Sequence, residues 1–339
     1  MKRLLNTLYI TTQDSYLNKE GECVVIHNDG AVKGKIPVHT LGGLVLFGRV
    51  SCSPALFGHC AENGVTISWL NEHGRFLASM HGPVSGNVLL RKAQYAASDN
   101  VEMAANIARN CIAGKLHNCR TVLQRTARNR PNADLDRAAR ELGTALSRLE
   151  SESSLDGLRG IEGDAARIYF SVFNHLIVSE HAAFAFAGRN RRPPLDPVNC
   201  LLSFLYTLLA HDIRSALEVV GLDPAVGFLH RIRPGRASLA LDMMEEFRPY
   251  LADRLALTLI NKAQLGPSDF KKQQSGAVVL SDDGRKTLLT AWQQRKQDEV
   301  VHPFLQEKMR TGMLFQVQAR LMARHLRGEL EAYPPVVVR

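Results

Sequence analysis

Two neighbouring stretches, Gly227-Phe228-Leu229-His230 and Ser238-Leu239-Ala240-Leu241-Asp242-Met243-Met244-Glu245-Glu246-Phe247-Arg248-Pro249, carry the features around which the chain is organised. In the first stretch, a single histidine follows a short apolar segment. Ser238 is the predicted N-cap of a helix that carries Asp242 and Glu245 three residues apart. That spacing places both carboxylates on one helix face. The opposite face is apolar and comprises Met243, Met244, Phe247 and Leu251.

An imidazole beside two carboxylates is a ligand set for a hard divalent cation, Mg²⁺ or Mn²⁺, rather than for zinc held by thiolates. The alternative is a surface helix with a solvated acidic face and a packed loop histidine. Spacing alone favours that alternative, so the choice depends on the rest of the chain.

Charge is distributed unevenly along the 339 residues, a length that fits one large or two ordinary domains. The net charge is +9, and residues 1–85 hold 7 Lys and Arg against 6 Asp and Glu, so the remainder carries +8. A basic region around an acidic pocket favours a polyanionic partner, with nucleic acid first and a membrane surface second.

The six cysteines show no C-x-x-C spacing and no zinc-finger pattern. The first residues lack the apolar region of a signal peptide, and no apolar run approaches the roughly 20 residues of a membrane span. We therefore expect a soluble, reduced protein of the cytoplasm that does not act in a membrane.

Strand patterns dominate the first 80 residues. Asn28-Asp29-Gly30 predicts a hairpin turn, and Ser53-Pro54 predicts the start of a short helix. From Asn87 the apolar period changes from two to 3.6. We therefore expect an α+β protein with a small β-rich domain, residues 1–85, and a larger all-helical domain, residues 86–339.

Helices are predicted over about 87–130, 134–150, 155–178 and 196–220, followed by the short helix that begins at Ser238. Residues 266–284 are rich in turn formers and are compatible with a hairpin. A last helical pair is expected to reach about Arg327, and Tyr333-Pro334-Pro335 begins a predicted tail.

Glu162 is a third candidate carboxylate, because glycines bracket it in Gly160-Ile161-Glu162-Gly163. Each glycine inside a helix costs about 1 kcal/mol relative to alanine. The glycines either leave room for a metal and a phosphate at Glu162 or allow close helix packing beside a solvated Glu162. The sequence leaves both open.

Glu162, His230 and Glu245, with Asp242 adjacent, form a plausible cation site on three segments of one helical domain. A cation held there would polarise a phosphate oxygen. Guanidinium groups bind phosphate bidentately, so the nearby arginines are candidate DNA contacts: Arg231, Arg233, Arg236 and Arg248. A basic loop adds Arg189, Arg191 and Arg192, for which a solvated loop is an equal alternative.

Several blocks together resemble the CRISPR-associated integrase, the metal-dependent DNA endonuclease of spacer acquisition. They are Gly160–Arg167, the run from Gly221-Leu222-Asp223-Pro224 to His230, Leu239–Pro249, Gly86–Tyr95 and Gly114–Asn118. The stretch from Gln316 to Tyr333, with Pro334-Pro335, is similar to the subtype I-C branch.

This resemblance implies an N-terminal β-sandwich and a helical catalytic domain. It also implies a homodimer, two copies of which bind a second adaptation protein in a hetero-hexameric complex. In the implied reaction the 3′-hydroxyl of captured double-stranded DNA attacks a phosphodiester of a CRISPR array. The family's metal ligands fall on Glu162, His230 and Glu245, and a further acidic position falls on Asp242, an accessory carboxylate.

Two other hypotheses remain open from the residues alone. One is a general metal-dependent nuclease without an integration role. The other is a non-catalytic DNA-binding scaffold whose acidic cluster is purely structural.

Overall fold

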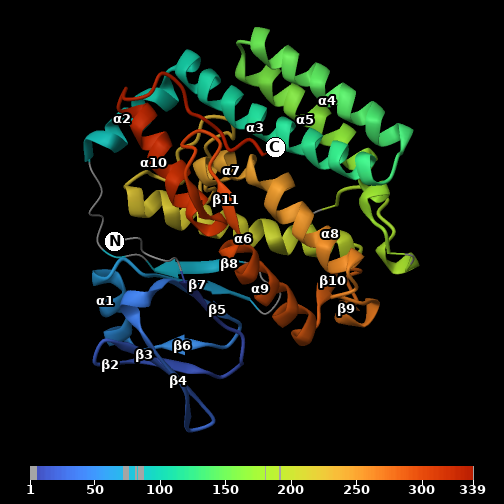
Figure 1. The fold of residues 1–339 in the computed structure, drawn as a ribbon. Coiled ribbons are helices and arrows are strands. Elements are labelled where there is room, and N and C mark those ends of the chain that lie inside the picture. The colour runs from blue at the N-terminus through green and yellow to red at the C-terminus, as the bar shows by residue number, and fades with distance from the viewer. Residues whose placement is uncertain are drawn as a thin grey trace. The chain divides into compact units, whose positions relative to one another are not determined.

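The strand patterns near the N-terminus form two four-stranded sheets in a computed structural model, which describes residues 6–71, 76–80, 82, 88–179, 181–190 and 192–338. The chain divides into two units, Met1–Ser85 and Gly86–Arg339 (Figure 1). A small region of sheet is thus followed by a mainly helical part, as the α+β prediction requires.

One sheet has the strand order β1-β5-β7-β8 and the other has the order β4-β3-β2-β6. The strands are β1 (Asn6–Ile10), β2 (Tyr16–Glu20), β3 (Cys23–Asn28), β4 (Ala31–Pro37), β5 (Leu41–Phe47), β6 (Ser51–Cys52), β7 (Thr66–Leu70) and β8 (Phe76–Met80). The predicted hairpin joins β3 to β4, and Asp29 and Gly30 both adopt positive φ, as a tight primed turn requires.

A shared hydrophobic core joins both sheets to helix α1 (Pro54–Glu62). The predicted start of that helix is confirmed, because Ser53 caps it by accepting a hydrogen bond from the Leu56 amide. A 3₁₀ turn, η1 (Val38–Thr40), leads into β5. Strand β5 pairs in parallel with both β1 and β7, so it lies inside its sheet and its apolar run Leu44–Phe47 is fully buried.

The second unit contains long helices around α3. Its α-helices are α2 (Val88–Asp99), α3 (Val101–Asn129), α4 (Ala133–Ser151), α5 (Leu155–Ser171), α6 (Pro197–Val220), α7 (Ser238–Met244), α8 (Arg254–Asn261), α9 (Asp282–Gln297) and α10 (Leu314–Leu326). A π-helical turn, η4 (Arg248–Asp253), precedes α8. The 3₁₀ turns are η2 (Phe173–Leu176), η3 (Ala182–Phe184), η5 (Pro267–Asp269) and η6 (Thr311–Met313).

Several predicted boundaries need correction. The tract expected over 87–130 is two helices, because Asn100 interrupts it and caps α3 through the Met103 amide. The helix expected to reach residue 178 ends at Ser171. Two short hairpins also make the unit less than all-helical. One, β9 (Phe270–Lys272) with β10 (Val278–Leu280), lies where a hairpin was expected; the other, β11 (Glu299–Val301) with β12 (Lys308–Arg310), lies in the expected last helical pair.

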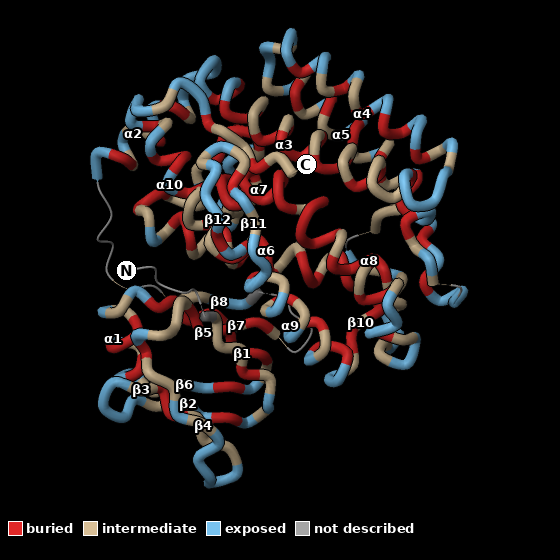
Figure 2. Tube along the Cα trace, in the orientation of Figure 1, coloured by how far each residue is buried: buried red, intermediate tan, exposed pale blue. Residues whose placement is uncertain are grey.

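Helix α7 does not have the solvated acidic face that the sequence left open as an alternative. Its residues are buried apart from the half-buried Leu241, and Ser238 and Asp242 are fully buried. Figure 2 shows the trace of α7 coloured mostly as buried. Ser238 is the first residue of the helix rather than its cap, and its hydroxyl donates to the Arg231 carbonyl instead. The hypothesis of a surface acidic helix is therefore wrong.

Within the described ranges, no helix has the length and apolar character needed to cross a membrane.

Leu46 provides a test of the N-terminal core. It is fully buried in β5, between Ile10 of β1 and Trp69 of β7. Leu46→Ala should lower the unfolding free energy of this unit by about 2 to 5 kcal/mol, because it leaves a cavity. Hydrogen exchange of peptides from β5 and β7 measures the change. Leu77→Ala, at a position 58% exposed on β8, is the matched control and should change little.

Candidate active site

Asp242 organises the loop that carries His230. Its Oδ2 accepts hydrogen bonds from the backbone amides of Phe228 and Leu229, at 2.5 and 2.9 Å. Its Oδ1 accepts from the His230 amide at 2.9 Å and pairs with His230 Nδ1 at 2.7 Å. A Cβ on Gly227 would lie 2.6 Å from Asp242 Oδ2, so only glycine lets the loop approach this closely.

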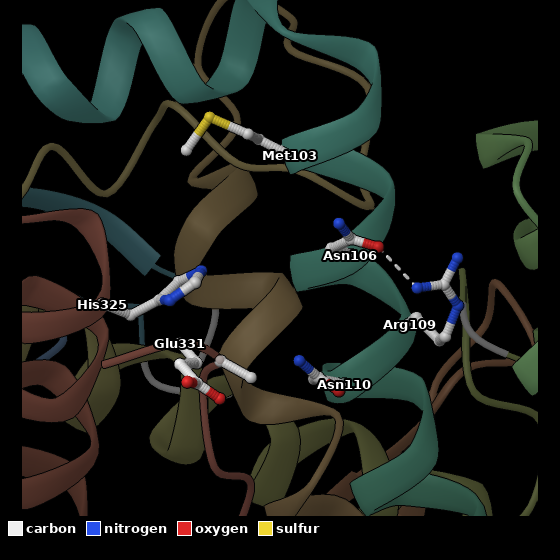
Figure 3. Close-up of a pocket in the computed structure, with 7 residues that line it drawn as sticks. Met103, Asn106, Arg109, Asn110, His325 and Glu331 are labelled. Atoms are coloured by element: carbon white, nitrogen blue, oxygen red, sulfur yellow. Dashed lines mark hydrogen bonds between the residues drawn. The ribbon is translucent and has the colours of Figure 1, made fainter. Parts of the chain in front are cut away.

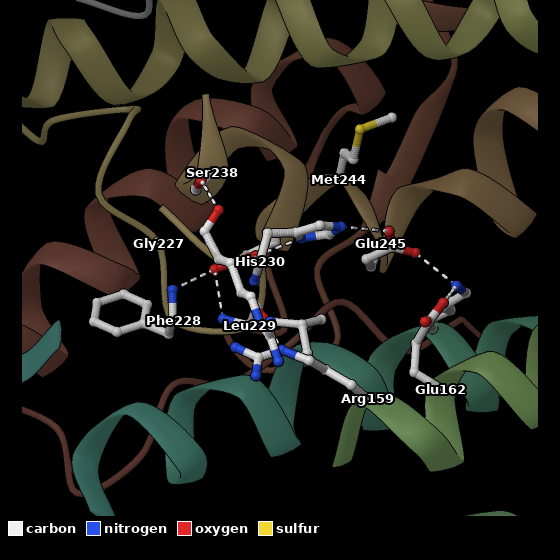
Figure 4. Close-up of polar contacts among 12 residues, drawn as sticks. Arg159, Glu162, Gly227, Phe228, Leu229, His230, Ser238, Met244 and Glu245 are labelled. Carbon is white, nitrogen blue, oxygen red and sulfur yellow. Dashed lines mark hydrogen bonds and ion pairs between the residues drawn. The ribbon is translucent and has the colours of Figure 1, made fainter. Parts of the chain in front are cut away.

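The orientation of the His230 imidazole follows from that contact. A carboxylate beside Nδ1 favours the tautomer with the proton on Nδ1, which leaves the lone pair on Nε2. Nε2 lies 4.0 Å from Glu245 Oε1, and Figure 4 shows the ring extending toward Glu245. Asp242 was predicted as an accessory carboxylate near the metal, and the structure places it behind the imidazole, where it positions His230.

Glu245 follows the last residue of α7 and is buried, with cations on both of its oxygens. Arg248 Nη1 lies 2.7 Å from Oε1, and Lys115 Nζ lies 2.8 Å from Oε2. Burial alone would raise the pKa of Glu245, but the charges of Arg248 and Lys115 outweigh it and lower the pKa to about 2. Glu245 is therefore an anion at neutral pH.

Glu162 reaches the same place from α5, and its side chain is 26% exposed. Its Oε1 also pairs with the Lys115 ammonium. A Cβ on Gly160 or Gly163 would meet no atom of the described chain within 4 Å. Close helix packing within the chain therefore does not explain these glycines, and they leave open space around Glu162.

Lys115 was not predicted as a site residue. It lies on the buried face of α3, and its side chain is only 7% exposed. Burial acts to lower the pKa of its ammonium, but Glu245 and Glu162 raise the pKa above its ordinary value. The sequence signals were a basic residue inside a largely apolar helix stripe and its place in the block Gly114–Asn118 that carries the family resemblance.

These side chains allow a test of whether the site suits a divalent cation. As they stand, no three His, Cys, Asp or Glu side chains within the described segments are close enough together to hold a metal ion. A positive ammonium instead stands between Glu162 and Glu245. The site already holds a cation between two carboxylates, with an imidazole nitrogen nearby. These donors are the ones that Mg²⁺ or Mn²⁺ prefers.

The arginines predicted to contact DNA fall into two groups. Arg192, Arg231 and Arg233 are exposed and Arg236 is half-buried, while Arg191 lies outside the described residues. Arg189 and Arg248 differ from these, because both are half-buried and their guanidinium groups have partners inside the protein. Arg189 donates to Asn199 Oδ1 at 2.6 Å, whereas Arg248, 13% exposed, pairs with Glu245.

A buried stack supports Arg248 from behind. Its guanidinium lies over the Tyr206 ring at 4.8 Å, and the Tyr206 hydroxyl donates to Asp253 Oδ1 at 2.7 Å. Burial raises the pKa of Asp253 to about 6, although the Tyr206 hydrogen bond and the Arg248 charge oppose that rise.

Glu246 points away from Glu245 and anchors the end of the chain. It accepts hydrogen bonds from the Tyr333 hydroxyl and the Val336 amide, both at 2.5 Å. Asn118 on α3 donates to the carbonyls of Glu246 and Val336, both at 2.7 Å. The segment predicted as a tail is thus a brace that ties α3 to the residue beside Glu245.

A separate pocket of about 410 Å³ lies between α3 and the end of α10 with the segment that follows it (Figure 3). Asn106 and Asn110 line it from α3, and His325 and Glu331 line it from the C-terminal side. It contains none of the predicted site residues.

Comparison with known proteins places this geometry in a family. The model of the family described as CRISPR associated protein Cas1 matches residues 8–294. The chain is 56% identical to the CRISPR-associated endonuclease Cas1 1 of Chlorobaculum tepidum, with both chains covered in full. The chain belongs to the Cas1 family. It is also 54% identical to the CRISPR-associated endonuclease Cas1 2 of Rhodospirillum rubrum, over 99% of each chain.

Solved structures show the same Cas1 fold. A CAS1 protein from Thermotoga maritima matches with a TM-score of 0.82 at 24% identity, over 97% of this chain and 99% of that one. A casposase bound to an integration product matches with a TM-score of 0.86 at 22% identity, over 99% and 95%. A Cas6-RT-Cas1–Cas2 complex matches with a TM-score of 0.84 at 23% identity, covering 99% of this chain and 36% of that one.

Replacing Asp242 by asparagine tests its positioning role. The amide would turn a donor toward backbone amides that already donate, so Asp242→Asn should lower the unfolding free energy by about 2 to 4 kcal/mol. Denaturant unfolding measures this change. Asp164→Asn, an exposed carboxylate on the same helix as Glu162, is the control and should stay within roughly 0.5 kcal/mol. Equal effects of the two variants would contradict the role of Asp242.

Asp253 gives the stability a specific pH dependence. Its folded pKa, about 6, lies above the ordinary value of 3.8, so the folded state binds more protons between these values. The contribution of Asp253 is therefore largest below about pH 4 and falls as the pH rises through 6, by roughly 3 kcal/mol in total. Denaturant unfolding of wild type and Asp253→Asn should be measured from pH 4 to 7. The unfolding free energy of wild type should fall relative to that of Asp253→Asn as the pH rises. A pH-independent difference would contradict it.

Proposed function

We propose that this Cas1-family protein is a divalent-metal-dependent DNA endonuclease and integrase that inserts foreign DNA fragments into a CRISPR array. The observation that supports it most is the meeting of Glu162 and Glu245 at one ammonium, with His230 Nε2 aimed at Glu245. The similarity to curated endonucleases over the full chain supports the same activity.

Glu162, Glu245 and His230 would hold the metal, Mg²⁺ or Mn²⁺. Bound there, the ion would supply Lewis-acid stabilisation of the negative charge that develops on the phosphate. Asp242 pairs with His230 Nδ1 and so directs Nε2 toward the site. Arg248 holds Glu245 ionised and oriented through Oε1.

DNA would be held by the exposed arginines rather than by those whose partners lie inside the protein. Arg231 and Arg233 follow His230 directly, and Arg192 lies in the basic loop. Contacts to phosphate by such residues make DNA affinity fall steeply with salt. The proposed reaction is attack by the 3′-hydroxyl of the captured fragment on a phosphodiester of the array.

The remaining finer features of the proposal come from the family resemblance. We propose a β-sandwich built from the two sheets of the N-terminal unit, residues 1–85, and its use as the dimerisation domain. We also propose a homodimer that joins a second adaptation protein in a hetero-hexameric complex, a partner suggested by the Cas1–Cas2 neighbour. Subtype I-C and action in the cytoplasm complete the proposal.

The metal hypothesis is tested by strand transfer with Mn²⁺, using labelled DNA that ends in a 3′-hydroxyl. His230→Ala and Glu245→Gln should each reduce joining by roughly 100-fold or more, because each removes a ligand. Asp164→Asn, outside the site on α5, should retain activity. Near-normal joining by both site variants would refute the metal site.

The same assay separates the alternatives. An integrase should not join fragments that end in a 3′-dideoxy nucleotide. A general nuclease would cut DNA whether the fragment ends in a 3′-hydroxyl or a 3′-dideoxy nucleotide. A non-catalytic scaffold would neither cut nor join with any metal.

A further inference from the structure

Lys115 stands between the two carboxylates that the proposed function assigns to the metal. Its Nζ lies 2.8 Å from Glu245 Oε2 and also contacts Glu162 Oε1. Glu245 Oε1 has a different partner, Arg248, at 2.7 Å. The ammonium therefore pairs with one oxygen of each proposed ligand. Arg248 occupies Glu245 Oε1, so Lys115 pairs with Glu245 Oε2.

A divalent ion held by Glu162 and Glu245 together would lie between the two carboxylates, as the ammonium does. Mg²⁺ binds carboxylate oxygens at about 2.0–2.1 Å, so an ion on Glu162 and Glu245 would lie in the space that the ammonium holds. Two cations so close together in a buried site repel strongly. Lys115 and the metal therefore cannot both use Glu162 and Glu245 as partners.

We propose that Lys115 is an internal counter-ion that holds Glu162 and Glu245 toward one another before metal binds, and that a divalent cation enters by displacing it. This inference rests on the proposed function. Lys115 thereby sets the metal affinity of the site, because binding includes the cost of breaking its two ion pairs.

The Lys115 side chain can move without a change in the backbone. A lysine carries its charge on a flexible four-carbon stem, so the ammonium moves without a change in the backbone of α3. Glu162, one of its two partners, is 26% exposed. The space beside Gly160 and Gly163 is open, with no atom of the described residues within 4 Å of an added Cβ.

Calorimetric titration of the full-length protein with Mn²⁺ tests this competition. Lys115→Met should bind Mn²⁺ roughly 10-fold or more tightly than wild type, because no ion pairs are broken. Lys296→Met is the matched control, since Lys296 is also buried and pairs with Asp212 at 2.9 Å on other helices. Its Mn²⁺ affinity should equal that of wild type.

Thermal unfolding of the same variants adds a second readout. Without metal, Lys115→Met should melt below wild type, because two carboxylates lose their counter-charge, and Mn²⁺ should raise its melting temperature more than that of wild type. A lysine with a merely structural role predicts weaker metal binding in the variant, or no change, and either result overturns the proposal.

Chemical labelling of wild type keeps the test independent of how the variant folds. Lys115 should resist an amine-reactive ester without metal and react several-fold more when Mn²⁺ is present, while labelling of Lys296 stays constant. Unchanged labelling of Lys115 overturns the proposal. If wild type binds Mn²⁺ and Lys115→Met binds it no more tightly, only this inference is refuted. If neither protein binds Mn²⁺, the proposed metal site is refuted as well.

Discussion

The site depends on one buried carboxylate, that of Asp242. A carboxylate without partners in the interior is strongly destabilising, and Asp242 avoids that cost by accepting hydrogen bonds from three consecutive backbone amides and pairing with the His230 ring. The backbone of the loop Phe228–His230 is therefore folded around the Asp242 carboxylate. Because Asp242 is fixed within α7, His230 is fixed relative to Glu245, three residues farther along the same segment.

The neighbouring carboxyl groups of Glu245 and Glu246 also have partners, but of these two only Glu245 pairs with cations of the described chain, and burial raises the pKa of Glu246 to about 7. Glu245 has Arg248 and Lys115, and Glu246 on the opposite side has Tyr333 and the Val336 amide. Two consecutive glutamates thus serve different purposes, one facing the site and the other anchoring the end of the chain. Gly114 makes the second arrangement possible, since a Cβ there would lie 2.7 Å from Pro335 and 3.1 Å from Glu246. Lys115, the next residue on α3, is held in register with the site by this brace.

The sequence predicted those parts of the fold and site that local chemistry determines. The hairpin at Asp29-Gly30, the cap at Ser53 and the spacing of Asp242 and Glu245 are all encoded within a few residues. Lys115 became visible only in three dimensions, because its partners come from helices far away in sequence. The same limit applies to Arg189 and Arg248, since a basic pattern does not show whether a guanidinium faces solvent or an acceptor inside the protein.

The contrast between Asp242 and Lys115 explains how the site combines rigidity with exchange. Asp242 has four short contacts, three of them to backbone, so its replacement by another partner would require the loop to unfold. Lys115 has only side-chain contacts and a flexible stem, so its partners can change while the backbone stays in place. In the proposed metal site, the rigid contact thus holds the imidazole and the exchangeable contact holds the carboxylates. Gly160 and Gly163 weaken the helix that carries Glu162, and the space beside each is open in the described part of the chain.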